Sequence, residues 1–154
     1  MSRHTREEEP VAEVVYNIAK QRIMQGLTDL DTTVLKAVAI ITSKTGADNP
    51  DLTTLAAIDA VGTVAFATGT RPTLGSLSVS VDNALDRAVA GAAAFSFPAD
   101  AVTALAMVIY DAGVDTNDGT RIPICFYDTG FGAGVDLTSG GLNITLTNGF
   151  LRGT

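Results

Sequence analysis

Two apolar stretches near the middle of the chain decide the fold: Thr103–Asp111, TALAMVIYD, and Ile122–Tyr127, IPICFY. The first is apolar at successive positions, so both of its faces are expected to be buried, as in a central strand. The second is rich in β-branched and aromatic residues, and Pro123 favours an edge strand or the start of a strand. The segment between them, DAGVDTNDGTR, has the composition of a loop. The pair therefore predicts two strands joined by a loop.

Shorter strand patterns flank this pair. The clearest is SLSVSVD, residues 76–82, in which Leu77, Val79 and Val81 alternate with polar residues and share one face. Strands at intervals of about 10–20 residues, with no Lys, Glu or Gln after Lys44 to favour helices between them, predict a mainly β protein, an antiparallel β-sandwich or barrel. The other expected strands are 33–42, 63–68, 89–97 and 142–147; residues 52–60 are ambiguous and could form a short helix capped by Asp51.

One α-helix is expected at the N-terminal end, over about residues 11–25. Pro10 suits the first turn of a helix and Gly26 suits its end. Arg22 falls on the apolar stripe of this helix, so either the stripe ends there or Arg22 meets a carboxylate on a partner. The residues that form the stripe by helical spacing are Val11, Val14, Val15 and Ile18.

Charge is divided unevenly along the chain, whose formal net charge is −7. Residues 1–44 carry six basic and six acidic side chains, whereas residues 45–154 carry four basic and eleven acidic ones. Because neutralising phosphates needs clustered Lys or Arg, this body excludes nucleic acid as a partner and disfavours an anionic membrane. Residues 1–10 are expected to be a charged arm, and residues 11–154 a single β-rich domain.

No segment has the features of a signal peptide or a membrane span. The apolar stretch after the charged arm is broken by Glu13, Asn17 and Lys20, unlike a signal-peptide core. The longest strongly apolar run, Ala104–Tyr110, is far shorter than the roughly 20 residues needed to cross a bilayer. We therefore expect the protein to stay in the cytoplasm or to join a particle assembled there.

The segment Asp115–Gly119, DTNDG, invites a calcium-binding interpretation. Counting back from Gly119 places Val114 at the first ligand position, so the spacing of a regular calcium loop fails. An irregular site would need Asp111, Asp115 and Asp118 to converge. An ordinary Asp/Asn/Gly loop explains the segment better, and we expect no metal.

Two other features could suggest a cofactor or a reactive group. Gly130–Gly134, GFGAG, leads toward a strand and is followed by no Lys, unlike a nucleotide-binding loop. It is expected to be a connection between strands. Cys125 is the single cysteine and lies in an apolar run, which favours a buried core residue over a nucleophile. We therefore expect no cofactor.

Catalysis finds little support in the residue types. The single histidine, His4, lies in the charged arm, and no Ser or Thr outside that arm has a histidine near it in the sequence to activate it. Paired carboxylates could act as acid and base, as in glycoside cleavage, but a chain with no Trp and three Tyr is poorly supplied for sugar binding. We expect no enzymatic activity and no catalytic residues. The candidate pairs are Asp82 with Asp86 and Asp111 with Asp128.

The composition of the body suits a subunit of an assembly. Surfaces poor in Lys and Glu lose less side-chain entropy when a neighbouring molecule orders them. The charged arm and the amphipathic helix then become the expected contact with a partner. The residues predicted for this interface are Arg3, Arg6, Val11, Val14, Val15, Ile18 and Arg22.

Six short stretches follow one another over most of the chain, from about residue 16 to residue 150. They are YNIAK (16–20), running on to Gly26, DTTVLKAV (31–38), RPTL (71–74), VSVD (79–82), MVIYD (107–111) and PICFYD (123–128). Their order resembles that of small virion proteins of tailed bacteriophages, of the head-decoration or head-fibre type. The resemblance implies a β-rich structural subunit bound to a phage head, with no catalytic residues to carry over.

On this resemblance we expect a capsid decoration, or cement, protein located in the virion. It would bind the outer surface of the major capsid protein as a homotrimer and stabilise the head by burying interface area over the repeating shell. One alternative is a neck, tail or fibre-base protein of the same virion. Another is a module that displays loop 111–121 or loop 129–141 toward host glycans, and an Asp-based hydrolase is the least supported.

Overall fold

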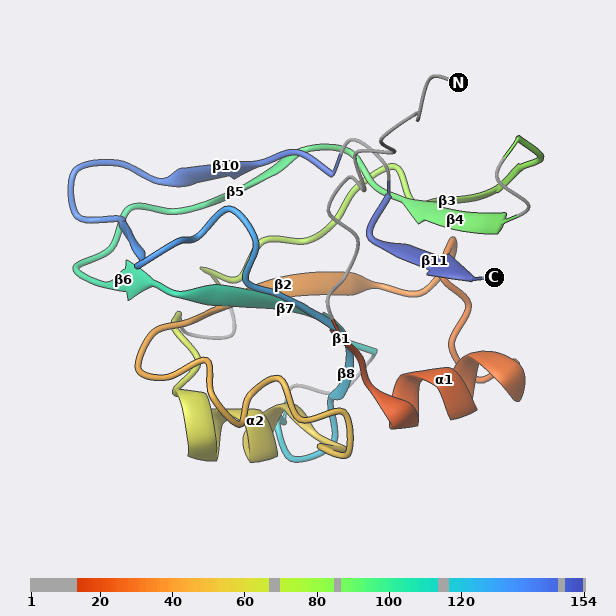
Figure 1. The fold of residues 1–154 in the computed structure, drawn as a ribbon, viewed down its shortest axis with the longest axis horizontal. Coiled ribbons are helices and arrows are strands. Elements are labelled where there is room, and N and C mark those ends of the chain that lie inside the picture. Colours follow the sequence, from red (N-terminus) through yellow and green to blue (C-terminus); the bar gives the residue numbers. More distant parts are fainter. Residues whose placement is uncertain (1–13, 67–69, 85–86, 114–116, 147–148, 154) are drawn as a thin grey trace, which may run out of the picture.

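The computed structural model describes residues 14–66, 70–84, 87–113, 117–146 and 149–153. At its centre is a four-stranded antiparallel sheet in the order β1–β8–β7–β2 (Figure 1). Every residue of β7 is buried, which explains why its sequence is apolar without alternation. The four strands are β1 (Val14–Val15), β2 (Leu35–Ile40), β7 (Ala106–Asp111) and β8 (Ile122–Tyr127).

Three smaller antiparallel sheets complete the β structure. The first pairs β5 (Phe95–Phe97) with β10 (Leu142–Ile144). The second has the order β11–β4–β3 and is built from β3 (Ser78–Asp82), β4 (Arg87–Gly91) and β11 (Leu151–Gly153). The third pairs β6 (Thr103–Ala104) with β9 (Val135–Asp136).

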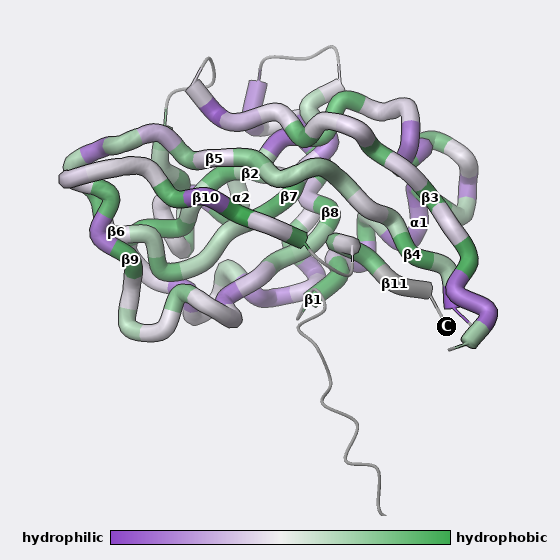
Figure 2. The backbone as a smooth tube through the Cα atoms, turned by 90° about the horizontal axis from the view of Figure 1, so that it is seen from above, coloured by the Kyte–Doolittle hydropathy of each residue, from purple (hydrophilic) through white to green (hydrophobic). Residues whose placement is uncertain are grey.

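The elements are stacked in layers. The β5–β10 pair lies over β2 and β7, and two helices, α1 (Asn17–Met24) and α2 (Leu55–Gly62), lie on the opposite side of the central sheet (Figure 1). Aromatic residues fill the upper layer, where the buried ring of Phe97 stacks on Phe66 at 5.7 Å and meets Phe95 edge-on at 6.0 Å. Figure 2 shows that the central strands β2, β7 and β8 are hydrophobic. The expected mainly β, antiparallel fold is confirmed, and the sheets do not close into a barrel.

The start of the predicted helix at residues 11–25 is wrong. Val14 and Val15 are extended and pair with Phe126 and Cys125 as strand β1, and the helix begins only at Asn17. Two β-branched residues fit either periodicity, and here the open side of β8 gives their backbone a partner. Tyr16 marks the boundary, because its backbone N–H donates to the Ile124 carbonyl at 3.1 Å. The end agrees better: α1 stops at Met24, just before Gly26 with φ +68°.

The ambiguous segment at 52–60 forms most of the helix α2, which runs from Leu55 to Gly62. The suggested cap, Asp51, lies too early, and Thr54 caps the helix by accepting the Ala57 N–H at 3.2 Å. The described part of the chain thus has two helices where a single helix was expected.

Several expected strands have different limits in the structure. The pattern at 122–127 corresponds to β8 without change, whereas 103–111 is divided at Leu105 into β6 and β7, which join different sheets. The segment 89–97 is divided into β4 and β5, and 63–68 contributes one isolated bridge, between Val64 and Ile40. In each case the tertiary partner, which local sequence does not reveal, sets where pairing stops.

The doubly buried strand β7 should dominate stability. We expect Ile109→Ala to lower the free energy of unfolding by about 2–5 kcal/mol, because Ile109 is fully buried between β2 and β8 and its loss leaves a cavity. Chemical denaturation monitored by circular dichroism measures this. Val61→Ala, at an exposed helix position, is the matched control and should change stability by less than about 1 kcal/mol. Equal effects of the two substitutions would contradict the assignment of β7 as the core.

Candidate partner interface

Four residues of the interface predicted from the sequence lie in the described part of the chain. Val14 and Val15 are half-buried in β1, where they pair with β8 of the same chain. Ile18, on α1, is half-buried and packs against the core. These three residues therefore help to hold the N-terminal segment on the body, and only part of each side chain is exposed to a partner. The remaining predicted residues, Arg3, Arg6 and Val11, lie outside the described residues.

Arg22 meets a carboxylate of its own chain through an intervening hydroxyl. Its Nε donates to Thr28 Oγ1 at 3.2 Å, and Thr28 Oγ1 donates to Asp111 Oδ2 at 3.0 Å. The other carboxylate oxygen of Asp111 accepts the Gly113 N–H at 2.8 Å. This chain of bonds fixes the end of α1 to the end of β7. It gives Arg22 a structural role that the apolar stripe alone does not indicate.

A small polar pocket lies beside this chain of bonds. Its volume is about 130 Å³, well below the roughly 300 Å³ at which ligand sites begin. A pocket of this size suits a few water molecules better than a substrate. It is lined by Arg22, Asp111, Ala112, Gly113, Thr120, Arg121 and Ile122.

A second charged cluster joins two segments that are far apart in the sequence. Asp118 accepts two bonds from Arg71, at 2.7 and 2.9 Å, and a third from Arg121 at 2.7 Å. Both guanidinium groups are buried and lie over the ring of Tyr110, with 5.7 and 5.5 Å from the guanidinium carbon to the ring centroid. One carboxylate thus holds two arginines against the central strand β7.

The loop that contains Asp118 and Arg121 also accepts hydrogen bonds from the backbone N–H groups at the start of α2. The Leu55 N–H donates to the Arg121 carbonyl at 3.0 Å, and the Ala56 N–H donates to the Asp118 carbonyl at 2.9 Å. Free N–H groups at a helix start need such acceptors. The cluster therefore connects α2, the segment around Arg71 and the loop before β8, and it serves as a cross-link of the body.

The electrostatics of the cluster follow from this geometry. The bonds from Arg71, with a smaller contribution from Arg121, hold the pKa of Asp118 below its ordinary value against the opposing effect of burial. Burial has the largest single effect on Arg71 and would lower its pKa, but the interactions with Asp118 and Tyr110 together outweigh it and the pKa is raised. Arg71 and Asp118 are therefore charged at neutral pH, and the carboxylate of Asp118 is turned toward the two arginines rather than toward a cation or a glycan.

Of the two carboxylate pairs considered for catalysis, only Asp111 with Asp128 is described in full, and the structure does not bring these two together. Asp111 lies opposite Ile122 at one end of the β7–β8 pair, whereas Asp128 follows Tyr127 at the other end and forms an ion pair with Lys44 at 3.0 Å. Asp82 forms an ion pair with Arg87 at 3.0 Å. Asp86, Asp115 and His4 lie outside the described residues.

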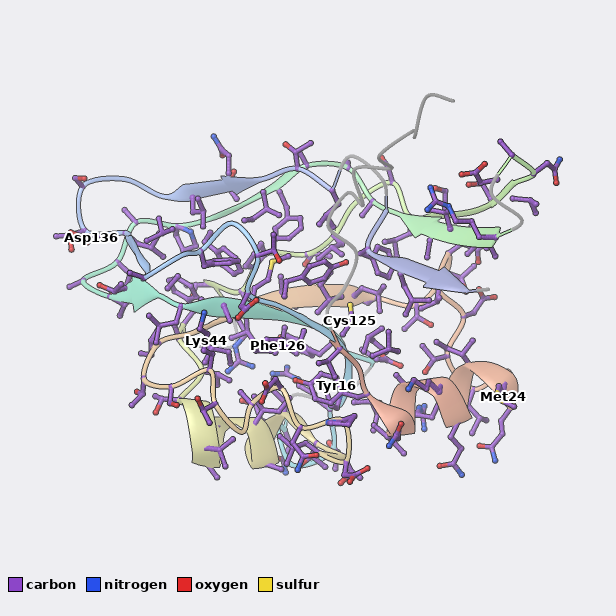
Figure 3. The ribbon with its side chains drawn as sticks, in the orientation of Figure 1. Tyr16, Met24, Lys44, Cys125, Phe126 and Asp136 are labelled. Atoms are coloured by element: carbon purple, nitrogen blue, oxygen red, sulfur yellow. The ribbon has the colours of Figure 1, made fainter. Side chains whose placement is uncertain are left out.

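The two remaining motifs have structural positions. The glycine-rich stretch 130–134 is the turn from β8 to β9, as expected, and Gly134 leads directly into that strand with φ +124°. Cys125 is fully buried in β8, and burial raises the pKa of its thiol. Figure 3 shows Cys125 and Tyr16 inside the body. A buried, protonated thiol of this kind is a poor nucleophile.

One surface feature was not expected from the sequence. The alternation in β3 is typical of a half-buried strand, yet Val79 and Val81 are 51% and 71% exposed. Met24, at the outer end of α1, is 86% exposed (Figure 3). β3 and this end of α1 lie at the same end of the molecule (Figures 1 and 2). Val79 and Val81 share one face of β3, and neighbouring exposed apolar side chains of this kind are typical of a contact surface.

No family model, no curated protein and no solved structure matches this chain. Within the described ranges, no helix has the length and hydrophobicity that crossing a membrane requires.

The ion pairs of Asp118 with two buried arginines should contribute more to the free energy of unfolding than the ion pair of Asp82 with the more exposed Arg87. Asp118→Asn should lower the free energy of unfolding by about 2–4 kcal/mol at neutral pH, because two buried arginines lose their counter-charge. Asp82→Asn is the matched control: its partner Arg87 is more exposed, so the loss should stay below about 1 kcal/mol. Denaturant titrations measure both values. A loss for Asp82→Asn as large as that for Asp118→Asn would contradict the cross-linking role.

Acid should remove the contribution of Asp118. Its pKa is lower in the folded than in the unfolded state, so the unfolded chain takes up the proton first as the pH falls. The contribution is complete above the unfolded pKa of about 3.9 and is lost as the pH falls through the folded value. The stability difference between wild type and Asp118→Asn should therefore narrow below about pH 4. A difference that is constant from neutral pH into this range would contradict this account.

Proposed function

We propose that this chain is a non-enzymatic decoration protein of a tailed-bacteriophage capsid. It binds the outer surface of the major capsid protein, as a homotrimer, and stabilises the head in the virion. The proposal starts from the resemblance of segment order described above. It is supported by the antiparallel β body and by the way that body uses its charged groups.

The observation that carries the proposal is the surface of the body. Small side chains occupy many of its exposed positions, and such side chains lose little entropy when a neighbouring molecule orders them. A surface of this kind suits a protein that makes the same contact many times over a shell. The exposed small residues include Ser76, Ser78, Ser80, Ser96, Ala99, Ala101, Thr103, Thr138 and Ser139.

The internal cross-links support the same role. Arg71, Asp118 and Arg121 fasten the loop before β8 to α2, and Arg22 fastens α1 to Asp111 through Thr28. These bonds make the body a rigid unit, so little free energy is spent on ordering it when it binds. In this proposal the charged arm, residues 1–10, makes the contact with the shell.

Removal of the arm tests the proposal. The full chain should co-sediment with empty phage heads, and deletion of residues 1–10 should reduce this binding at least about tenfold, equivalent to about 1.4 kcal/mol. Replacement of residues 1–10 by a Gly/Ser sequence of equal length is the control for length. Circular dichroism should show the β signal of the described strands in all three chains, because the deletion leaves every one of those strands in place.

Two results would contradict this proposal. If the full chain does not bind heads, the decoration role is wrong. If the deleted chain binds as well as the full chain, the arm is not the contact.

A further inference from the structure

The outer edge of β3 is the longest open strand edge in the described part of the chain. β3 has five residues and lies at the end of the order β11–β4–β3, and no described strand pairs with its outer side. β4, β7 and β8 lie inside sheets. An open edge of this length is a template on which another strand can pair.

The other long edge strand, β2, is treated differently. Its outer side is covered by the segment that follows α2: the Ala37 N–H donates to the Pro72 carbonyl at 3.0 Å, and the Ala65 N–H donates to the Ala39 carbonyl at 2.8 Å. Isolated bridges join Lys36 to Thr73 and Ile40 to Val64 at the same edge. Among the described residues, the fold therefore closes one long edge against further pairing and leaves that of β3 open.

β3 also lacks the residues that usually prevent edge pairing. Its sequence, SVSVD, contains no Lys and no Pro, and it pairs with β4 over all five residues without a bulge. Val79 and Val81 share one face and are 51% and 71% exposed. Both the backbone and the apolar side chains of β3 are thus available to a partner strand.

We propose that this edge binds the β3 edge of a second copy of the chain, in an antiparallel pair with its two-fold axis at Ser80. In this register Val79 faces Val81 of the second copy, and all five residues of β3 are paired. Apolar residues then oppose apolar residues on one face, as a self-complementary two-fold contact requires. The two three-stranded sheets join into one sheet of six strands.

Neighbouring registers fit less well. A shift by one residue in either direction places the valines opposite Ser or Asp residues instead of opposite each other. A two-fold axis at Val79 would bring in Ser76, whose φ of +49° is not that of a strand. An axis at Val81 would pair β3 with Asn83 and Ala84, which belong to the turn after the strand.

Charge also permits this pair, although each chain carries a net charge of −7. In the register centred on Ser80, Asp82 lies opposite Ser78, whose hydroxyl can donate to the carboxylate. Arg87 Nε already donates to Asp82 Oδ2 at 3.0 Å, so the charge at each end of the pair is balanced. No acidic side chain of β3 opposes another. This contact does not depend on a capsid partner. If the chain is also a trimer, as proposed above, the β3 pair would link a chain of one trimer to a chain of another trimer.

Mass measurement in solution tests the pairing. Sedimentation equilibrium of the wild-type chain should give assemblies with an even number of 15.9 kDa subunits, either a pair of single chains or a pair of trimers. Val81→Lys should halve that mass at the same concentration and raise the dissociation constant of the pair at least about tenfold, because Lys on an edge strand opposes pairing. Val61→Lys, at an exposed position in α2, is the matched control and should leave the mass unchanged.

Cysteine cross-linking tests the register and does not depend on the lysine variants. The native Cys125 is fully buried, so a cysteine introduced in β3 is the reactive one. With the axis at Ser80, Ser80→Cys should form a covalent dimer on mild oxidation by dissolved oxygen, because the two thiols oppose each other. Ser78→Cys should not, since it faces Asp82.

The inference is overturned if the wild-type assembly has an odd number of subunits or is a monomer. It is also overturned if Val81→Lys leaves the mass unchanged, or if Ser80→Cys and Ser78→Cys cross-link equally. Unfolding curves of each variant show whether it is folded. Failure of head binding in the arm-deletion experiment would leave these masses and cross-links unaffected, so the two proposals fail separately.

Discussion

The backbone pairing of β7 with β8 is the constraint on which the rest of the structure depends. β7 is buried on both faces, and its backbone N–H and C=O groups need partners that water cannot supply. β8 on one side and β2 on the other provide them. Once these strands are aligned, β1 has an edge to join, and the layer that contains Phe97 has a surface to cover.

The charged cross-links follow from the same constraint. The loop between β7 and β8 brings Arg121 over the ring of Tyr110, a residue of β7, and Asp118 onto Arg121. Arg71 then completes the cluster from a distant part of the chain, and the start of α2 is bonded to the loop. The high proportion of Asp in this body thus has a structural use, in bonds with buried arginines and in turns.

The sequence predicted an element best where the residues of that element alone set its conformation. β8 could be predicted to its limits, because IPICFY is bounded by loop residues on both sides. Val14 and Val15 could not, because their spacing fits a helix and only the edge of β8 makes them a strand. The Arg71–Asp118 pair spans 47 residues, so no local pattern indicates it, although Asp118 and Arg121 at helical spacing are a partial signal. The alternation in β3 predicts a strand but not that its valines are exposed.

The decoration role is tested most directly by the number of copies of this protein in a purified virion. Quantitative mass spectrometry, with the major capsid protein as the internal standard, measures that number. A protein that binds the repeating shell should be present at on the order of hundreds of copies per particle, in a fixed ratio to the capsid subunit. A count of about a dozen, the number expected for a ring at one vertex, would contradict decoration and place the protein at the neck or tail.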